Sequence, residues 1–309
     1  MRGDLPVLHF LRCPLDHGEL RSSLDWPWAD RDGELTCKTC GARHPIRGGV
    51  ACFSEATGLC PVKTAEQKAR DVGARAYDGR MSKLRGRAEE PASLAALDAK
   101  EDEVVAELGA GTGRMTVQVA KAAKGVFAVD FSLASLHVLR DRMPAELAAR
   151  VPLVQADLCK LPLASGAFDK VASFQTLEHV PTADGRCQAL AEARRVLGAT
   201  GRFVASVYNW SRSKQRRAAR GVGDNSRKEG FHATTPPIYY YNFEAPELHG
   251  LLDQAGFHKV SLRGLYLELW WLLALGGLGL PLHDRWGPTD RGREHGHLLL
   301  ATADARSLD

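Results

Sequence analysis

From residue 103 onward, short apolar runs of the strand type alternate with longer segments whose apolar residues recur at helical spacing. The runs read as strands cover 103–108, 125–131, 151–157, 168–174, 201–208, 257–265 and 296–303. The segments read as helices cover 112–123, 132–143, 183–197 and 244–256. Strands that alternate with helices of about ten or more residues indicate βαβ units and a parallel sheet. This pattern predicts an α/β domain whose ligands bind at the carboxyl ends of the strands.

The rest of the chain shows two other patterns. Residues 1–60 contain short strand-like pieces, turns and five of the seven cysteines, which predicts a small separate domain. Residues 61–100 form a polar connector compatible with helices, and we expect it to lie over a ligand. Within the large domain at 101–309, an insert at about 209–243 interrupts the alternation and predicts a lid.

Composition narrows the class of protein. The 309 residues are 44% hydrophobic and 25% charged, which is typical of a globular chain. The net charge of +4 neither requires nor excludes nucleic acid, because binding depends on how the charges cluster. Cysteines without an apolar export signal indicate reduced thiols or metal ligation, so we expect a cytoplasmic protein.

One apolar run, residues 265–282, includes Glu268 and is shorter than the roughly 20 residues that a membrane-spanning helix needs. We expect no integral membrane span and interpret the run as a buried or ligand-facing helix. Association with a membrane surface stays open as the alternative.

A glycine-rich turn follows the first predicted strand of the large domain. Gly109, Gly111 and Gly113 occupy alternate positions in "ELGAGTGRM". A dinucleotide-binding turn needs a glycine where Arg114 stands, and a phosphate loop ends in Gly-Lys-Ser or Gly-Lys-Thr, which is absent here. The spacing therefore predicts a sharp strand-to-helix turn with exposed backbone and no dedicated anion clamp.

Three acidic residues stand at the ends of three consecutive predicted strands, namely Glu107, Asp130 and Asp157. Asp130 comes some 20 residues after the glycines, where a carboxylate accepts hydrogen bonds from ribose hydroxyls. Glu107 would repel a phosphate and suits an ammonium group or hydroxyls. Together the three acids describe a nucleoside with a cationic tail. Solvated strand ends, a helix cap at Asp130 and a turn at Asp157 are the alternatives.

Four motifs in this order, "ELGAGTG", "VDFS", "QADLCKLPLASGAFDKVASFQTLEHV" and "EARRVLGATGRFVASVYN", resemble a class I S-adenosylmethionine-dependent methyltransferase. The pattern is similar to the group that includes the ubiquinone- and menaquinone-biosynthesis enzymes, and it covers roughly residues 70–305. "VLGATGR" departs from the lysine and proline usual in that turn. The resemblance implies a Rossmann-like seven-stranded sheet and S-adenosyl-L-methionine as cofactor.

The resemblance also implies cofactor-binding residues. The glycine turn would lie against the methionine part, Asp130 would hold the ribose, Asp157 and Leu158 would frame the adenine, and Phe131 would pack on its face. Gln175 would sit beneath the methionine end and Tyr77 would close over the cofactor. The full predicted set is Glu107, Gly109, Ala110, Gly111, Gly113, Asp130, Phe131, Asp157, Leu158, Gln175 and Tyr77.

A methyl acceptor needs an in-line approach and, for a phenol, enol or amine, a base. His179 in "FQTLEHV" is the candidate base, with a structural histidine as the alternative. The insert mixes basic and aromatic residues, which favours a lid over a small-molecule acceptor and leaves RNA open as the alternative partner. A non-catalytic cofactor-binding or activator protein is the third hypothesis, and the oligomeric state is undetermined. The predicted acceptor-binding residues are Trp210, His232, Tyr239, Tyr240 and Tyr241.

The N-terminal cysteines form a second group. Cys37-x-x-Cys40 followed by Gly41 is typical of a zinc-binding turn, whereas Cys13 lacks a second cysteine and has Asp16 and His17 nearby. With its "HPIRGGV" ending, this stretch resembles the zinc-ribbon domain of the tRNA-methyltransferase activator family. Large-subunit rRNA guanine methyltransferases carry an N-terminal zinc module as well. We expect structural zinc on Cys13, His17, Cys37 and Cys40, and the missing cysteine leaves occupancy open.

Overall fold

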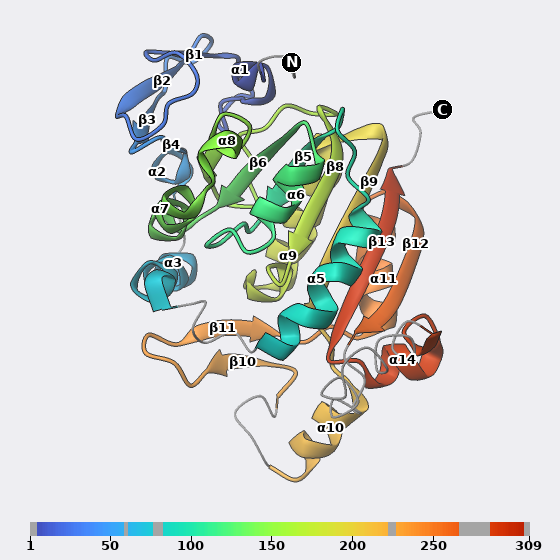
Figure 1. Ribbon diagram of the computed structural model, residues 1–309. Helices are drawn as coiled ribbons and strands as arrows, with labels where there is room; N and C mark the ends of the chain where they lie inside the picture. The colour runs from blue at the N-terminus through green and yellow to red at the C-terminus, as the bar shows by residue number, and fades with distance from the viewer. Residues whose placement is uncertain (1–4, 59–60, 77–82, 222–226, 266–284, 306–309) are drawn as a thin grey trace.

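The computed structural model describes residues 5–58, 61–76, 83–221, 227–265 and 285–305. Its main element is one sheet in the order β1-β2-β3-β4-β7-β6-β5-β8-β9-β13-β12 (Figure 1). The N-terminal strands are β1 (Leu20–Ser22), β2 (Gly33–Cys37), β3 (Arg43–Arg47) and β4 (Val50–Cys52). The others are β5 (Val104–Leu108), β6 (Gly125–Asp130), β7 (Leu153–Gln155), β8 (Phe168–Phe174), β9 (Leu197–Tyr208), β12 (Phe257–Leu265) and β13 (Leu298–Ala305). A separate hairpin pairs β10 (Glu229–His232) with β11 (Ile238–Tyr241).

Helices cover both faces of the sheet. One face packs on α5 (Lys83–Leu97), α6 (Thr116–Ala122) and α7 (Leu133–Arg142), and the other on α9 (Ala183–Val196) and α11 (Ala245–Gln254). The short helices are α1 (Val7–Phe10), α2 (Ser54–Thr57), α8 (Ala145–Ala148), α10 (Arg212–Ala219), α14 (Asp290–His295) and the 3-10 turns η1 (Ala74–Ala76) and η2 (Leu177–His179). Helix α3 (Pro61–Gly73) lies beside the β10–β11 hairpin (Figure 1). All of β5 is buried, because helices cover both faces of the sheet at this central strand.

The order β7-β6-β5-β8-β9-β13-β12 confirms the seven-stranded sheet that the resemblance implies. Strands β7, β6, β5, β8 and β9 run parallel. Strand β13 is antiparallel to both β9 and β12, which the alternation of strands and helices alone did not predict. The five parallel strands place their carboxyl ends along one edge of the sheet.

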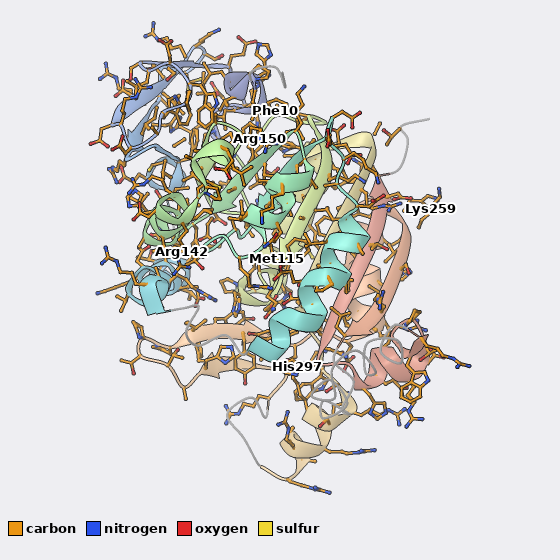
Figure 2. All side chains as sticks on the ribbon, in the orientation of Figure 1. Phe10, Met115, Arg142, Arg150, Lys259 and His297 are labelled. Atoms are coloured by element: carbon orange, nitrogen blue, oxygen red, sulfur yellow. The ribbon has the colours of Figure 1, made fainter. Side chains whose placement is uncertain are left out.

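The N-terminal strands continue the same sheet instead of forming a detached domain. Strand β4 pairs in parallel with β7, with Val50 opposite Leu153. Figure 2 labels Phe10 at this junction, where its ring lies 5.0 Å from that of Phe127 and 5.3 Å from that of Phe168. The N-terminal segment therefore shares its hydrophobic core with the large domain, and it covers the edge of β7 that would otherwise expose unpaired backbone groups.

Among the residues that the structure describes, no helix has the length and apolar character needed to cross a membrane. The apolar run at 265–282 lies outside the described residues except for Leu265, so the helix predicted there stays a prediction.

Candidate functional site

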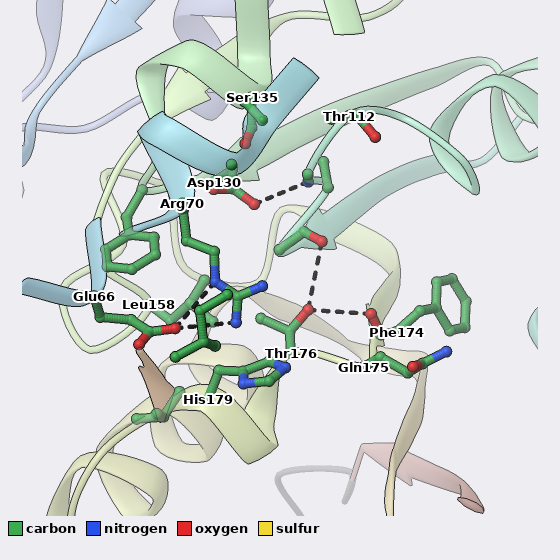
Figure 3. A pocket seen from close by; sticks show the side chains of 18 of the residues that line it. Glu66, Arg70, Thr112, Asp130, Ser135, Leu158, Phe174, Gln175, Thr176 and His179 are labelled. Atoms are coloured by element: carbon green, nitrogen blue, oxygen red, sulfur yellow. Dashed lines mark hydrogen bonds and ion pairs between the residues drawn. The ribbon is translucent and has the colours of Figure 1, made fainter. Parts of the chain in front are cut away.

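A cavity opens at the carboxyl ends of β5 and β6, where the glycine turn, α3 and η2 meet (Figure 3). Its strand-side wall comes from the ends of β5, β6 and β8 and from the loop after β7. Its opposite wall comes from α3, η1, η2 and β11. The residues that line it are Lys63, Glu66, Ala69, Arg70, Gly73, Ala74, Glu107, Gly109, Ala110, Gly111, Thr112, Arg114, Met115, Asp130, Phe131, Ser135, Asp157, Leu158, Phe174, Gln175, Thr176, His179, Val180, Pro181 and Ile238.

Gly111 and Gly113 of this turn have different surroundings in the structure. Gly111 has φ +54°, and a Cβ placed there would meet no other atom within 4 Å, so its backbone borders open cavity space. Gly113 has φ +88°, and a Cβ there would lie 2.1 Å from Leu139. Gly113 does not line the cavity. This glycine lets the turn pack closely against α7, and its contact with the cofactor stays a prediction.

Two of the predicted acids lie in the cavity wall, Glu107 buried and Asp130 half-buried. Glu107 is 2% exposed, and its Oε2 has no hydrogen-bond partner. Burial raises the pKa of Glu107 to about 7. Asp130 accepts one backbone hydrogen bond from Gly111 (2.8 Å) and one from Ser132 (2.8 Å), and burial raises its pKa as well. A buried carboxyl oxygen without a donor is a site that a ligand's N–H or O–H group would satisfy.

The third acid, Asp157, is held by a residue of α3. Lys63 Nζ lies 2.5 Å from its Oδ2, and Cys159 N–H donates to its Oδ1 at 3.0 Å. Gln67 of the same helix donates from Nε2 to the carbonyl oxygen of Phe131 at 2.6 Å. Helix α3 therefore covers the predicted adenine end of the cavity and is fixed to both sides of it.

Gln175 stands at the end of β8 in a left-handed conformation, φ 51°, which is uncommon for a residue other than glycine. Its Nε2 donates to Glu89 of α5, which is fully buried and also accepts from Arg114 Nη2 (3.0 Å) and Ser206 Oγ (2.7 Å). This network holds Gln175 and Arg114 at the cavity wall. The sequence analysis did not predict Glu89, because the connector sequence contains no signal that separates a buried acid from the exposed ones around it.

His179 reaches the cavity from η2. Its Nδ1 lies 2.6 Å from the carbonyl oxygen of Tyr239, which requires the proton on Nδ1 and leaves the lone pair on Nε2. Burial lowers the pKa of His179 well below its ordinary value, and the Arg70 guanidinium lowers it further. The ring is therefore neutral at physiological pH and able to accept a proton at Nε2.

Tyr239 and His232 lie near His179, but among the described residues none of the five predicted acceptor-binding residues lines the cavity. The ring of His232 is 6.2 Å from that of His179 and 4.7 Å from that of Tyr240. Tyr241 donates its hydroxyl to Glu247 of α11, so it points into the protein. Trp210 instead lines a second hollow beside α10 and α14. Trp210, His232, Tyr240 and Tyr241 stay predictions as acceptor-binding residues, and Tyr239 contacts His179 through its backbone carbonyl oxygen. Tyr77 lies outside the described residues.

The three cysteines predicted as zinc ligands lie together in the structure, and the fourth residue beside them is Asp16. Ligand atoms of Cys13, Asp16, Cys37 and Cys40 all lie within 4.8 Å of one another, with Cys13 Sγ 3.7 Å from Cys40 Sγ. Three thiols and a carboxylate at these separations fit tetrahedral zinc. His17 is not in this group, because its backbone turns into the left-handed region at φ 57°. Asp16 replaces His17 as the fourth candidate ligand.

Comparison with known protein families gives two matches, one for the domain with the cavity and one for the segment with the cysteine group. Residues 106–205 match the family described as a methyltransferase domain, and residues 4–49 match Trm112p-like proteins. A demethylmenaquinone methyltransferase of Streptomyces avermitilis is 30% identical over 190 residues, which cover 55% of this chain and 74% of that protein. The chain belongs to the class I S-adenosylmethionine-dependent methyltransferases. The cofactor of this family is S-adenosylmethionine.

Two further matches agree with this assignment. A probable S-adenosylmethionine-dependent methyltransferase of Mycobacterium tuberculosis is 31% identical over 162 residues, and the match spans about half of each protein, 52% of this chain and 51% of that one. A solved complex between the Haloferax volcanii Trm112 methyltransferase activator and a methyltransferase matches with a TM-score of 0.54 at 20% identity, covering 78% of this chain and 97% of the matched one. The structural match supports the methyltransferase fold.

The chemical character of the residues that line the cavity fits S-adenosylmethionine, the cofactor of this family. Gly111 leaves open space beside its backbone, and Glu107 presents a buried oxygen without a donor. Phe131 and Leu158 add apolar surface at the end where Asp157 lies. This wall therefore offers hydrogen-bond acceptors and apolar surface of the kinds that an amino-acid tail, ribose hydroxyls and a flat base would require.

Proposed function

We propose that this protein transfers a methyl group from S-adenosylmethionine to a small-molecule acceptor in the cavity between the sheet and α3. The observation that carries the proposal is the combination of the buried acid Glu107 with the half-buried acid Asp130, which accepts a hydrogen bond from the open backbone at Gly111. The name of the Streptomyces relative, a demethylmenaquinone methyltransferase, gives a small molecule as acceptor and supports this class.

S-adenosylmethionine supplies a methyl group on a sulfonium that is already a good leaving group. The work left to the protein is to hold the acceptor in line with that methyl group and to keep water out, effects that together lower the barrier strongly. Helix α3 suits this task, because Lys63 and Gln67 fix it over the strand ends. The apolar residues Ile238, Val180 and Pro181 line the side of the cavity next to His179.

His179 is the group we assign as general base. The carbonyl oxygen of Tyr239 fixes its orientation and its tautomer, so Nε2 is the nitrogen that takes a proton from the acceptor. Burial keeps the ring unprotonated, so the base is available across the neutral range of pH. Such a positioned base contributes roughly 10²- to 10⁴-fold to a rate.

The positions of the basic and cysteine-rich segments favour a small molecule over RNA. Helix α10, which carries Arg212, Arg216 and Arg217, lies at the opposite end of the molecule from the cysteine group of β1–β4 (Figure 1). One RNA contact would have to span that distance and still deliver a base beneath α3. The N-terminal segment serves better as a zinc-binding extension that completes the sheet at β7. We accordingly propose that residues 1–60 form this extension and that residues 61–100 cover the cofactor. Residues 101–309 would form the catalytic domain.

The test replaces His179 by Asn, whose amide can still donate to Tyr239 but offers no basic nitrogen. Methyl transfer from labelled S-adenosylmethionine to hydroxyl- and amine-bearing small molecules is measured for the parent protein, for His179→Asn and for His249→Asn, an exposed histidine of α11. We expect kcat to fall roughly 10²- to 10⁴-fold in His179→Asn alone, with unchanged affinity for S-adenosylhomocysteine. Equal rates in all three proteins would remove His179 from the reaction.

A further inference from the structure

A cation lies in the wall of the cavity next to the proposed general base His179. Arg70 is on α3, and Figure 3 shows its guanidinium between the side chains of Glu66 and His179, with Thr176 next to it. None of the sequence motifs includes this residue. The charge of Arg70 acts on both walls of the cavity, since it lowers the pKa of His179 of η2 and counteracts the rise in the pKa of Asp130 of β6.

Glu66 fixes the orientation of this cation. Its Oε1 accepts from Arg70 Nε at 3.0 Å and lies 3.0 Å from Nη2. Its Oε2 accepts the backbone N–H of Tyr239 at 2.9 Å. Glu66 is 3% exposed, so these bonds form away from water and hold the pair firmly.

Tyr239 of β11 thus positions both the cation and the proposed base. Tyr239 N–H binds Glu66, which holds Arg70, and Tyr239 C=O binds His179 Nδ1. One peptide segment therefore sets a fixed cation beside a fixed neutral base. A cation next to a proton acceptor stabilises the anion that forms when a hydroxyl group loses its proton.

We infer that the acceptor is a phenol or an enol, and that Arg70 selects it by binding its oxyanion. This inference rests on the proposed function and names its substrate class. The hydroxyl proton passes to Nε2 of His179, and the oxygen's electron pair forms the new bond to the methyl carbon. The carbon–sulfur bond breaks with its electron pair on sulfur, so the products are the methyl ether, S-adenosylhomocysteine and one proton that His179 later releases.

The inference is tested without turnover, by binding 4-nitrophenol to protein saturated with S-adenosylhomocysteine. The phenolate absorbs visible light and the neutral phenol does not, so an optical titration reports both the affinity and the pKa of the bound molecule. Neutral 4-nitroaniline, which has nearly the same shape, is the control ligand. Lys68→Gln, an exposed charge removed from the same helix, is the control variant.

We expect Arg70→Gln to weaken phenolate binding about ten- to a hundredfold and to raise the pKa of the bound phenol, because one charge-assisted hydrogen bond is lost. Arg70→Lys should retain most of the affinity, and Lys68→Gln and 4-nitroaniline should show no change. Unchanged phenolate affinity in Arg70→Gln, no phenolate binding to the parent protein, or a loss confined to S-adenosylhomocysteine affinity would each overturn the inference. Failure of the parent protein to bind S-adenosylhomocysteine would instead refute the proposed function.

Discussion

Replacing Asp130 by Ala perturbs the cofactor end of the cavity at one carboxylate. Its Oδ2 accepts from Gly111 and its Oδ1 from Ser132, both at 2.8 Å, and the proposed ribose hydroxyls would use the remaining lone pairs. The substitution therefore removes the proposed ligand bonds and also the two bonds that shape the turn and the start of α7.

The two effects have separate magnitudes. One or two charge-assisted bonds to the cofactor correspond to about 1–3 kcal/mol of binding free energy, or roughly a six- to a 150-fold loss of affinity. Each backbone N–H left buried without a partner costs about 1–3 kcal/mol of unfolding free energy. Asp130→Asn should lose less stability than Asp130→Ala, because the amide oxygen still accepts one of the two bonds.

Calorimetry with S-adenosylhomocysteine and thermal unfolding measure the two quantities on the same preparations. Asp169→Ala is the matched control, since Asp169 Oδ2 accepts the backbone N–H of Val104 at 2.8 Å at the other end of β5. We expect both variants to lose stability and only Asp130→Ala to lose affinity. If both bound S-adenosylhomocysteine as tightly as the parent protein, Asp130 would have no part in the cofactor site.

Two further predictions concern the metal group and a buried acid. Elemental analysis should find about one zinc ion per chain, strongly reduced in Asp16→Ala and in Cys37→Ser and unchanged in His17→Ala; zinc loss in His17→Ala with retention in Asp16→Ala would reverse the ligand assignment. Glu178 is fully buried with no partner for either carboxyl oxygen, and burial raises its pKa to about 8. Because the folded-state pKa lies above the unfolded value of about 4.5, the folded state binds more protons and loses stability as pH rises between about 4.5 and 8. The unfolding free energy of Glu178→Gln relative to the parent protein should therefore increase from pH 5 to pH 9 by an amount on the order of 3 kcal/mol, and a constant difference across that range would contradict this.

The sequence pattern predicted the strand ends well, because their signal is local. The apolar runs before Glu107 and Asp130 became β5 and β6, and the parallel pairing of these strands puts both acids on one wall. The packing of Gly113 against α7 was not predicted, because a glycine that faces a ligand and one that faces a helix give the same signal in the sequence. Only the packing of Leu139 against it separates the two.

The residues that the sequence analysis missed act across long separations in the chain. Glu66 meets Tyr239, and Glu89 meets Ser206, through contacts that depend on how α3 and α5 dock. A usable signal was present in the connector: Lys63, Glu66, Gln67 and Arg70 recur at the spacing of one helix face. That spacing identifies a polar face but does not say which surface it covers.

The zinc group shows a different limit. Asp16 stands three residues after Cys13, the same interval that separates Cys37 from Cys40, so the interval alone favoured Asp16 over His17. The left-handed backbone at His17 and its absence from the ligand group cannot be deduced from the residue type.

The central claim is that S-adenosylmethionine binds between the strand ends and α3, and a crystal structure with S-adenosylhomocysteine tests it most directly. We predict the ribose at Asp130, the amino-acid tail beside Glu107 and Gly111, and the base against Phe131 and Leu158. A ligand found at any other site, or a cavity that stays empty at saturating S-adenosylhomocysteine, would contradict the account.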